Sequence, residues 1–343
     1  MDPPAINKTM DRADLDRPNC RAVLIELFAL MRRMQARGAA YSSWYGRTGT
    51  WPSAWEHINR GPGYQPWPDN PDELHVPWFL LWEIAWLVAN TPLRPGSRVL
   101  DMGGAGSLFS CYLAARGHEV HAIDLQEGLC RQANETATIM NWRLTAQCSD
   151  MTRLAFSDAS FDHVFSVCVL EHLPVAGRVR CGGQVARVLR PGGTASYTFD
   201  YRDPQAFGRL DTPEDVDRQL VAGSNLTVRG NRRFVDAGER YLTPPQCFGL
   251  GRFTRTAAQA HALLTGSVAR RRILRGDISY TFGAIFLEKA STSTARRREH
   301  AARPLNPSER ELVNVGCGFS SKLTRFCSAN NLAGKWPIRT LLP

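Results

Sequence analysis

The stretch that decides the fold is Arg-Val-Leu-Asp-Met-Gly-Gly-Ala-Gly-Ser-Leu-Phe-Ser, residues 98–110. Its apolar start predicts a short buried strand, and its end predicts the first turn of a helix. Between them, Gly103, Gly104 and Gly106 lack a Cβ atom, so the backbone can approach a ligand closely. The helix that follows points its free N–H groups at whatever binds there. We therefore expect a ligand-binding turn here.

Strands and helices alternate downstream of this turn. The sequence predicts strands at residues 99–100, 120–123, 144–148, 163–169 and 194–199, and helices at residues 108–116, 127–140 and 178–189. Short strands joined by helices predict an α/β fold with a parallel sheet and right-handed crossovers. Two further strands are expected at residues 268–274 and 278–289.

Aspartates mark the ends of the expected strands: Asp101, Asp124, Asp150 and Asp200. Ligands of parallel sheets bind at the carboxyl ends of the strands. Asp124 follows Gly103 by 21 residues, and its carboxylate can accept hydrogen bonds from both hydroxyls of a ribose. Asp150 can accept a hydrogen bond from an exocyclic amine, with Met151 beside it for the face of the base. A nucleoside-containing cofactor is therefore expected.

Four motifs in this order resemble one family. The turn 101–107, the acid at 124, the segment Phe-Asp-His-Val-Phe-Ser-Val-Cys-Val-Leu-Glu-His-Leu at 161–173 and Val-Leu-Arg-Pro-Gly-Gly at 188–193 are similar to those of class I S-adenosylmethionine-dependent methyltransferases of the small-molecule type. The resemblance implies S-adenosyl-L-methionine as cofactor and a small molecule as methyl acceptor. It also implies a Rossmann-like, doubly wound, mostly parallel sheet of seven strands whose last strand is antiparallel.

The resemblance implies a set of cofactor-binding residues at one edge of this sheet: Asp101, Gly103, Gly104, Ala105, Gly106, Asp124, Leu125, Asp150, Met151 and Cys168. The glycine turn would lie under the methionine part of the cofactor. Asp124 would bind the ribose, with Leu125 against the adenine. Asp150 and Met151 would hold the adenine edge and face, and Cys168 would lie near the sulfonium and its methyl group.

Two positions of the turn depart from the family pattern. Ala105 and Ser107 stand where the family usually has glycine. An alanine adds a methyl group and restricts positive φ angles, so we expect a slightly different turn or a tighter pocket.

Methyl transfer from a sulfonium is a direct displacement, in which the protein mainly aligns the reacting atoms. An oxygen nucleophile can also need a base, and His172 with Glu171 beside it is the best-placed candidate pair. The alternative is that this pair only caps the following segment or holds the loop. Weaker candidates for substrate contact are Asp200, Tyr201, Asp203, His57 and His75.

Residues 1–76 are expected to form a helical and tryptophan-rich cap. Residues 1–19 are polar and expected to fray, and a helix is predicted at residues 20–37. Seven of the nine tryptophans fall between Trp44 and Trp86, where they either wall a ligand cavity or pin an irregular segment to the domain. Pro77 suits the first turn of a helix ending near Asn90.

The methyltransferase domain is expected over residues 77–289, with a substrate-side insertion at 201–253, and residues 290–343 as a basic linker and tail. The segment 296–343 has nine basic and three acidic residues, a net +6 of the chain's +10. The main domain is therefore close to neutral, which argues against nucleic acid as its partner. An RNA methyltransferase stays an alternative because of the tail.

The nine cysteines are scattered, with no Cys-x-x-Cys pair and no histidine at ligand spacing. Neither a metal site nor a disulfide framework is expected, and reduced thiols predict a cytoplasmic protein. The longest apolar stretch, residues 76–88, is interrupted by Glu83 and too short to span a bilayer, so no membrane span is expected. Two other functions remain to be weighed. A protein that binds the cofactor without catalysis would fit the altered turn. A nicotinamide-dependent oxidoreductase fits the turn less well, because Asp101 precedes the glycines.

Overall fold

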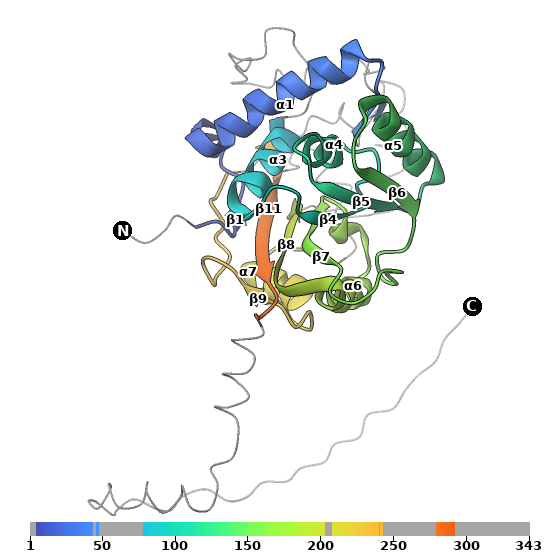
Figure 1. Ribbon diagram of the computed structural model, residues 1–343. Helices are drawn as coiled ribbons and strands as arrows, with labels where there is room; N and C mark the ends of the chain where they lie inside the picture. The colour runs from blue at the N-terminus through green and yellow to red at the C-terminus, as the bar shows by residue number, and fades with distance from the viewer. Residues whose placement is uncertain are drawn as a thin grey trace, which may run out of the picture. The chain divides into compact units, whose positions relative to one another are not determined.

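Five parallel strands form the centre of the computed structural model, which describes residues 5–43, 46–47, 78–202, 208–239, 241–242 and 279–291. Their spatial order is β8 (Leu189–Tyr201), β7 (Phe161–Val167), β4 (Arg98–Met102), β5 (Glu119–Asp124) and β6 (Leu144–Cys148). The strand β11 (Ser279–Glu288) runs antiparallel to β8. The expected parallel sheet with an antiparallel last strand is therefore confirmed (Figure 1).

The sheet has more strands than the seven expected. Three strands of two residues each pair antiparallel with the outer edge of β11: β1 (Lys8–Thr9), β9 (Thr227–Val228) and β10 (Tyr241–Leu242). With them the described sheet has nine strands. Such short pairings leave no hydrophobic alternation in the sequence, which is why they were not expected.

The prediction that residues 1–19 fray is wrong for the described part of that segment. Beyond β1, residues Arg12–Asp16 form a 3₁₀ turn, η1, and buried polar side chains fasten the segment. The side chain of Asn7 donates to the carbonyl oxygen of Arg229 and accepts from the N–H of Phe286, both at 2.7 Å. The partners lie more than 200 residues away in sequence, so local composition could not reveal them.

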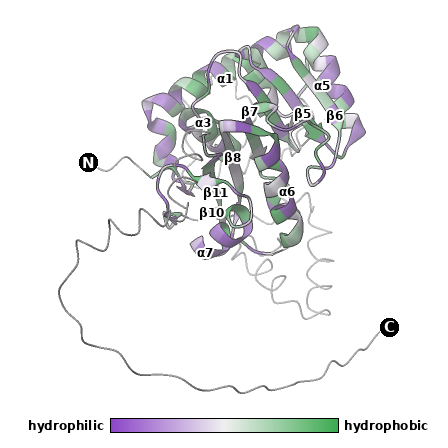
Figure 2. Cartoon of the chain, turned by 60° about the horizontal axis from the view of Figure 1, so that its bottom comes forward, coloured by the Kyte–Doolittle hydropathy of each residue, from purple (hydrophilic) through white to green (hydrophobic). Residues whose placement is uncertain are grey.

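Helices cover both faces of the sheet. α1 (Pro18–Ala36), α3 (Trp78–Asn90), α4 (Leu108–Ala115) and α5 (Glu127–Met140) share one apolar core with one face, and α6 (Val175–Val188) shares a second core with the other. This is the doubly wound arrangement that the sequence predicted. The helical period of apolar residues explains α1, in which hydrophobic and hydrophilic segments alternate along the ribbon (Figure 2).

Trp82 and Trp86 of α3 are fully buried, with ring centroids 5.7 Å apart. The predicted buried face of this helix is confirmed for both residues. A connection of seven residues, 91–97, joins α3 to β4.

The described part of the insertion, residues 208–239, packs beside the sheet. It contains α7 (Pro213–Val216) and the π-helical turn η3 (Asp217–Val221), whose apolar side chains join the same core as α6. The structure thus places this part along the flank formed by α6 and β11. Among the described helices, none is long and apolar enough to span a bilayer.

Every described residue lies within the compact unit Met1–Ala295. Several expected features lie outside the described residues: the strand 268–274, most of the tryptophan-rich segment, His57, His75 and Asp203.

Candidate functional site

The glycines of the turn after β4 allow a close approach of the backbone, as the sequence predicted. Gly103 and Gly106 have φ angles of +79° and +72°, which side-chain-bearing residues rarely adopt. A Cβ atom added at Gly103 would lie 2.6 Å from Val169 Cγ1, and one at Gly104 would lie 1.9 Å from Asp101 Oδ2. The turn therefore packs against the carboxylate of β4 and against the loop after β7.

Asp101 is fully buried beneath this turn. Its Oδ2 accepts hydrogen bonds from Ser110 Oγ at 2.7 Å and Ser107 Oγ at 3.3 Å. Its Oδ1 is buried and has no hydrogen-bond partner among the described residues. Burial raises the pKa of Asp101 to about 6. A buried carboxylate oxygen without a partner suits a ligand that brings a hydrogen-bond donor.

The two departures from the family pattern have structural consequences. Ser107 is the N-cap of α4: its Oγ accepts the N–H of Ser110 at 3.0 Å while its hydroxyl reaches Asp101. Ala105 is buried, and the positive φ angles of the turn belong to Gly103 and Gly106 instead. The turn thus contains Ala105 and Ser107 without a positive φ angle at either residue.

One side of the site is formed by the ends of β5 and β6. Asp124 is half-buried, and its Oδ1 accepts the N–H of Gln126 at 2.9 Å. Asp150 is exposed, and the hydrogen bonds from the N–H and hydroxyl of Thr152 lower its pKa. The side chain of Leu125 is 72% exposed and Met151 is half-buried, so both offer apolar surface there.

The other side is formed by the loop after β7. Cys168 has a φ of +49° and donates its N–H to the carbonyl oxygen of Thr198 at 3.1 Å. The short turn η2 (Leu170–His172) follows and separates two sequence neighbours: Glu171 is buried, whereas His172 is exposed. Glu171 Oε1 accepts the N–H of Asp200 at 3.1 Å. The two members of the expected catalytic pair therefore lie in different surroundings.

Glu83 of α3 was missed as a site residue. Its side chain is buried, and Cys168 Sγ donates a hydrogen bond to its Oε1 at 2.5 Å. Burial raises the pKa of Glu83 to about 8. The sequence carried one signal for it, because Glu83 is the only charged residue in the apolar helix 78–90. Such a residue needs a specific partner in the fold.

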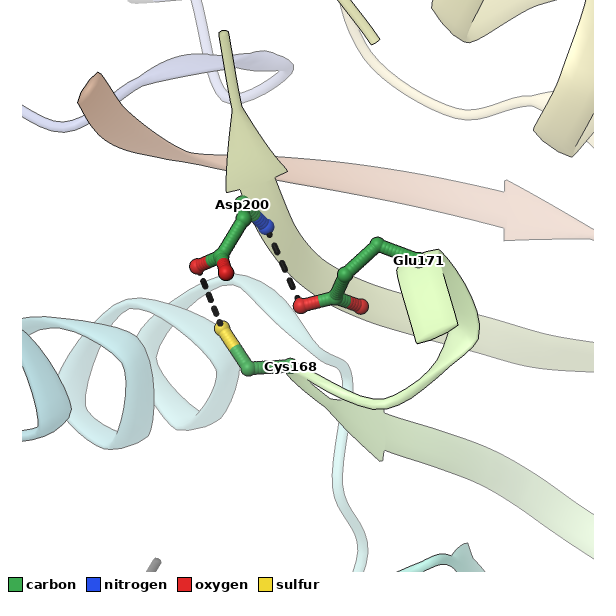
Figure 3. Close-up of side chains that lie close together, drawn as sticks. All are labelled: Cys168, Glu171 and Asp200. Atoms are coloured by element: carbon green, nitrogen blue, oxygen red, sulfur yellow. Dashed lines mark hydrogen bonds between the residues drawn. The ribbon is translucent and has the colours of Figure 1, made fainter. Parts of the chain in front are cut away.

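Glu83, Cys168, Glu171 and Asp200 together form what we call the acid–thiol cluster, three members of which are drawn in Figure 3. The Sγ of Cys168 and one carboxylate oxygen each of Glu171 and Asp200 lie within 4.8 Å of one another. Burial raises the pKa of Glu171 to about 8. Burial and the neighbouring carboxylates raise the pKa of Cys168 well above its usual value, so the thiol keeps its proton.

The order of the strands sets the order of these groups. Going from β6 through β5, β4 and β7 to β8, the edge carries Asp150, Asp124, the glycine turn, Cys168 and Asp200. Burial raises the pKa of Asp101, and the charge of Asp124 adds to this effect. This layout places a row of polar groups along one edge of the sheet, from the ends of β6 and β5 across the glycine turn to the acid–thiol cluster.

Residues 99–193 match the family model described as a methyltransferase domain. The 27-O-demethylrifamycin SV methyltransferase of Amycolatopsis mediterranei is 36% identical over 49% of this chain and 62% of its own length. A ubiquinone biosynthesis O-methyltransferase of Hahella chejuensis is 34% identical over 33% of this chain and 47% of its own length. A 24-methylenesterol C-methyltransferase 2 of Oryza sativa subsp. japonica is 33% identical over 36% of this chain and 34% of its own length. The chain thus covers less than two thirds of each of these relatives.

Proposed function

We propose that this chain, whose residues 99–193 match the model of a methyltransferase domain, is a class I S-adenosylmethionine-dependent methyltransferase that transfers a methyl group from S-adenosyl-L-methionine to a small molecule. The observation that carries the proposal is the unpartnered, buried Oδ1 of Asp101 beneath a glycine turn that leaves no room for a Cβ at Gly103 or Gly104. An oxygen atom that lacks a donor there fits the ammonium of the cofactor's methionine part.

The residues around the turn fit the remaining parts of this cofactor. Asp124 would accept hydrogen bonds from the ribose hydroxyls, and Asp150 would accept one from the adenine amine, with Leu125 and Met151 against the ring. The cofactor supplies an electrophilic methyl group on a sulfonium. The protein's own contribution is to hold the acceptor in line with that group and to exclude water.

We propose His172 as the base that takes the proton from a hydroxyl acceptor. Its exposed side chain can reach an acceptor that enters from solvent, whereas Glu171 is buried and holds the backbone of Asp200. Glu171 is therefore a positioning residue in this proposal rather than a catalytic one. Two of the three relatives are named for O-methylation or a demethylated oxygen, so hydroxylated small molecules are the first acceptors to test.

The decisive experiment is calorimetric titration of the folded full chain with S-adenosylmethionine. We expect saturable binding of one equivalent. Absence of binding up to about 1 mM ligand, equivalent to weaker than about −4.1 kcal/mol, would overturn the proposal. Once binding is established, a panel of hydroxylated, amine and carbon acceptors with radiolabelled cofactor separates a methyltransferase from a protein that binds the cofactor without catalysis.

We also propose a cytoplasmic location. The support is that the cysteines among the described residues are unpaired: Cys20, Cys111, Cys130, Cys148, Cys168 and Cys181. Free thiols are typical of a reducing compartment. Localisation of a tagged full chain in its native host tests this.

A further inference from the structure

Arg178 lies in the first turn of α6 and is almost completely buried, with 2% of its surface exposed. Its Nε donates to the carbonyl oxygens of Leu170 and Leu173 at 3.1 and 3.0 Å, and its Nη2 donates to that of Glu171 at 2.5 Å. A helical turn leaves its last carbonyl groups without partners inside the turn. Arg178 supplies donors to this end of η2, so one side chain holds the turn.

The same guanidinium also reaches the insertion. Its Nη1 donates to the carbonyl oxygen of Gly208 at 2.8 Å and to Gln219 Oε1. Gln219 is 2% exposed, and its Nε2 donates to the carbonyl oxygen of Arg209 at 2.9 Å. Gly208 has a φ of +69°, and a Cβ atom there would lie 2.6 Å from Val175 Cγ2 of α6. The insertion is therefore held closely against α6 at this point.

The chemistry of these contacts suits a link that defines positions. The five described acceptors of Arg178 are four main-chain carbonyl oxygens and one side-chain amide oxygen. The donors of a guanidinium form a rigid, planar fork, so hydrogen bonds from it to fixed carbonyl groups define the relative position of both segments. Gln219 belongs to the π-helical turn η3, and such turns are rare and often mark functional sites.

The turn η2 determines where its side chains lie. The N–H of His172 donates to the carbonyl oxygen of Val169 at 3.1 Å, which closes the 3₁₀ turn. In this geometry Glu171 is buried and His172 is exposed. Because Arg178 donates to the same turn, it joins the insertion to the segment that carries His172.

We propose that Arg178 and Gln219 are positioning residues for methyl transfer, which hold η2 in the orientation in which His172 accepts a proton from the methyl acceptor. This inference rests on the proposed function, and in particular on His172 as the base. It adds that the insertion, through Gln219, controls the alignment of that base. The proposed cofactor contacts include neither residue, so the effect falls on turnover and not on the binding of S-adenosylmethionine.

Gln219→Met tests the link. Methionine has a similar length and removes both the acceptor for Arg178 and the donor to Arg209. Arg178 itself is kept, because its loss would leave a set of carbonyl groups without their donor, at a cost that threatens folding. The matched control is Gln184→Met, since Gln184 accepts a hydrogen bond from Arg187 at 3.0 Å near the other end of the same helix.

The first measurement is amide hydrogen exchange of the ligand-free full chain, followed in peptides that cover residues 170–173. We expect faster exchange there in Gln219→Met than in wild-type protein, and unchanged exchange in Gln184→Met, because only the first variant removes a partner of Arg178. Exchange at the wild-type rate in Gln219→Met would overturn the inference and leave the proposed function standing.

The second measurement is a double-mutant cycle with His172→Gln, run with the hydroxylated acceptor that gives the highest wild-type turnover in the acceptor panel. Gln219→Met alone is expected to lower kcat by about 10–10²-fold, the cost of a small misplacement of a reacting group. In the His172→Gln background the same substitution is expected to leave kcat nearly unchanged, because the residue that it misplaces is already absent. The dissociation constant of S-adenosylmethionine is expected to keep its wild-type value in each variant.

Gln219→Glu separates the two hydrogen bonds of Gln219. It keeps an oxygen that accepts from Arg178 but removes the donor to Arg209, so kcat is expected to return toward the wild-type value. A Gln219→Glu protein as slow as Gln219→Met would contradict the role of the Arg178 contact.

Two further outcomes separate this inference from the proposed function. Equal losses of kcat from Gln219→Met in the wild-type and His172→Gln backgrounds would indicate a general structural role and overturn the inference alone. A wild-type protein that binds no S-adenosylmethionine, or that methylates no acceptor in the panel, would overturn the proposed function together with the inference. Circular dichroism of each variant confirms that it is folded.

Discussion

The thiol of Cys168 donates a hydrogen bond to the carboxylate of Glu83 across 2.5 Å, and so joins the loop after β7 to the helix that precedes β4. The two residues are 85 positions apart in sequence. Gly103 packs against Val169, the residue that follows Cys168, so the loop that Glu83 holds lies beside the glycine turn.

The stability of the fold should fall as the pH rises from 6.5 to 8. Burial raises the pKa of Glu83 and Glu171 to about 8, so the folded state holds protons that the unfolded chain has lost. The stabilisation that these two groups contribute is fully present below the pKa of the unfolded state, near 4.5, and is lost as the pH rises past 8. The pKa of His163 is lowered from its usual value of 6.5 to about 4, so this residue makes stability increase with pH, but only below pH 6.5. Urea unfolding across this range measures the slope.

Glu83→Gln should flatten that slope by up to about 1.4 kcal/mol per pH unit. Glu135→Gln, on an exposed part of α5, should retain the wild-type slope. An unchanged slope in Glu83→Gln would show that this carboxyl ionises normally in the folded protein.

Asp124→Ala should weaken the binding of S-adenosylmethionine at least about tenfold, because a charged hydrogen bond contributes about 1.5–3 kcal/mol. Calorimetric titration provides the dissociation constant. Asp158→Ala removes a carboxylate that is 77% exposed on the loop before β7 and is expected to leave binding unchanged. Unaltered affinity in Asp124→Ala would mean that the ribose lies elsewhere.

Gly104→Ala should impair both stability and cofactor binding. The added Cβ would lie 1.9 Å from Asp101 Oδ2, so the buried carboxylate must move. Gly128→Ala in α5 is the matched control, because a Cβ there has nothing within 4 Å and alanine favours a helix by about 1 kcal/mol. Thermal unfolding should show opposite shifts for the two variants. A Gly104→Ala protein as stable as wild type would contradict the close packing of the turn.

Ser107→Ala should cost about 1 kcal/mol of unfolding free energy, because it removes the N-cap of α4. Ser107→Gly restores the residue usual in the family and should cost only a few tenths of a kcal/mol at the cap. Both variants also lose the hydroxyl that reaches Asp101 at 3.3 Å. Comparison by urea unfolding separates the cap from the contact to Asp101; equal stability of all three proteins would rule out a capping role.

His172→Gln should lower kcat on a hydroxyl acceptor by about 10²–10⁴, the usual contribution of a general base, and leave the dissociation constant of S-adenosylmethionine unchanged. The exposed position of His172 makes a large loss of stability unexpected. Normal kcat in a folded variant would show that the acceptor needs no proton transfer to this residue.

The central sheet could be predicted because each strand and helix carries its own hydrophobic period, and the glycine turn because its φ angles demand glycine at Gly103 and Gly106. The helix over residues 127–140 was predicted with its observed bounds. The helix α6 begins at Val175, three residues before its expected start, since Pro174 ends the preceding turn and α6 starts directly after it.

What could not be predicted depends on contacts between distant parts of the chain. The burial of Glu83 against Cys168 needs α3 and the loop after β7 to meet, and nothing in either segment encodes that meeting. The opposite surroundings of Glu171 and His172 arise from the 3₁₀ geometry of a single turn. The assigned roles of the cofactor-binding residues stay predictions until the titrations above are made.

The outer strand β11 has a consequence for synthesis of the protein. It pairs with β8 on one side and with β1, β9 and β10 on the other, and the N–H of Phe286 is taken by Asn7. The β11 partners of residues 7–9 are therefore translated nearly 280 residues after those residues. Until then the groups that pair with β11, including the edge of β8, lack these native partners, so a ribosome stalled before residue 279 should carry a chain dependent on chaperones.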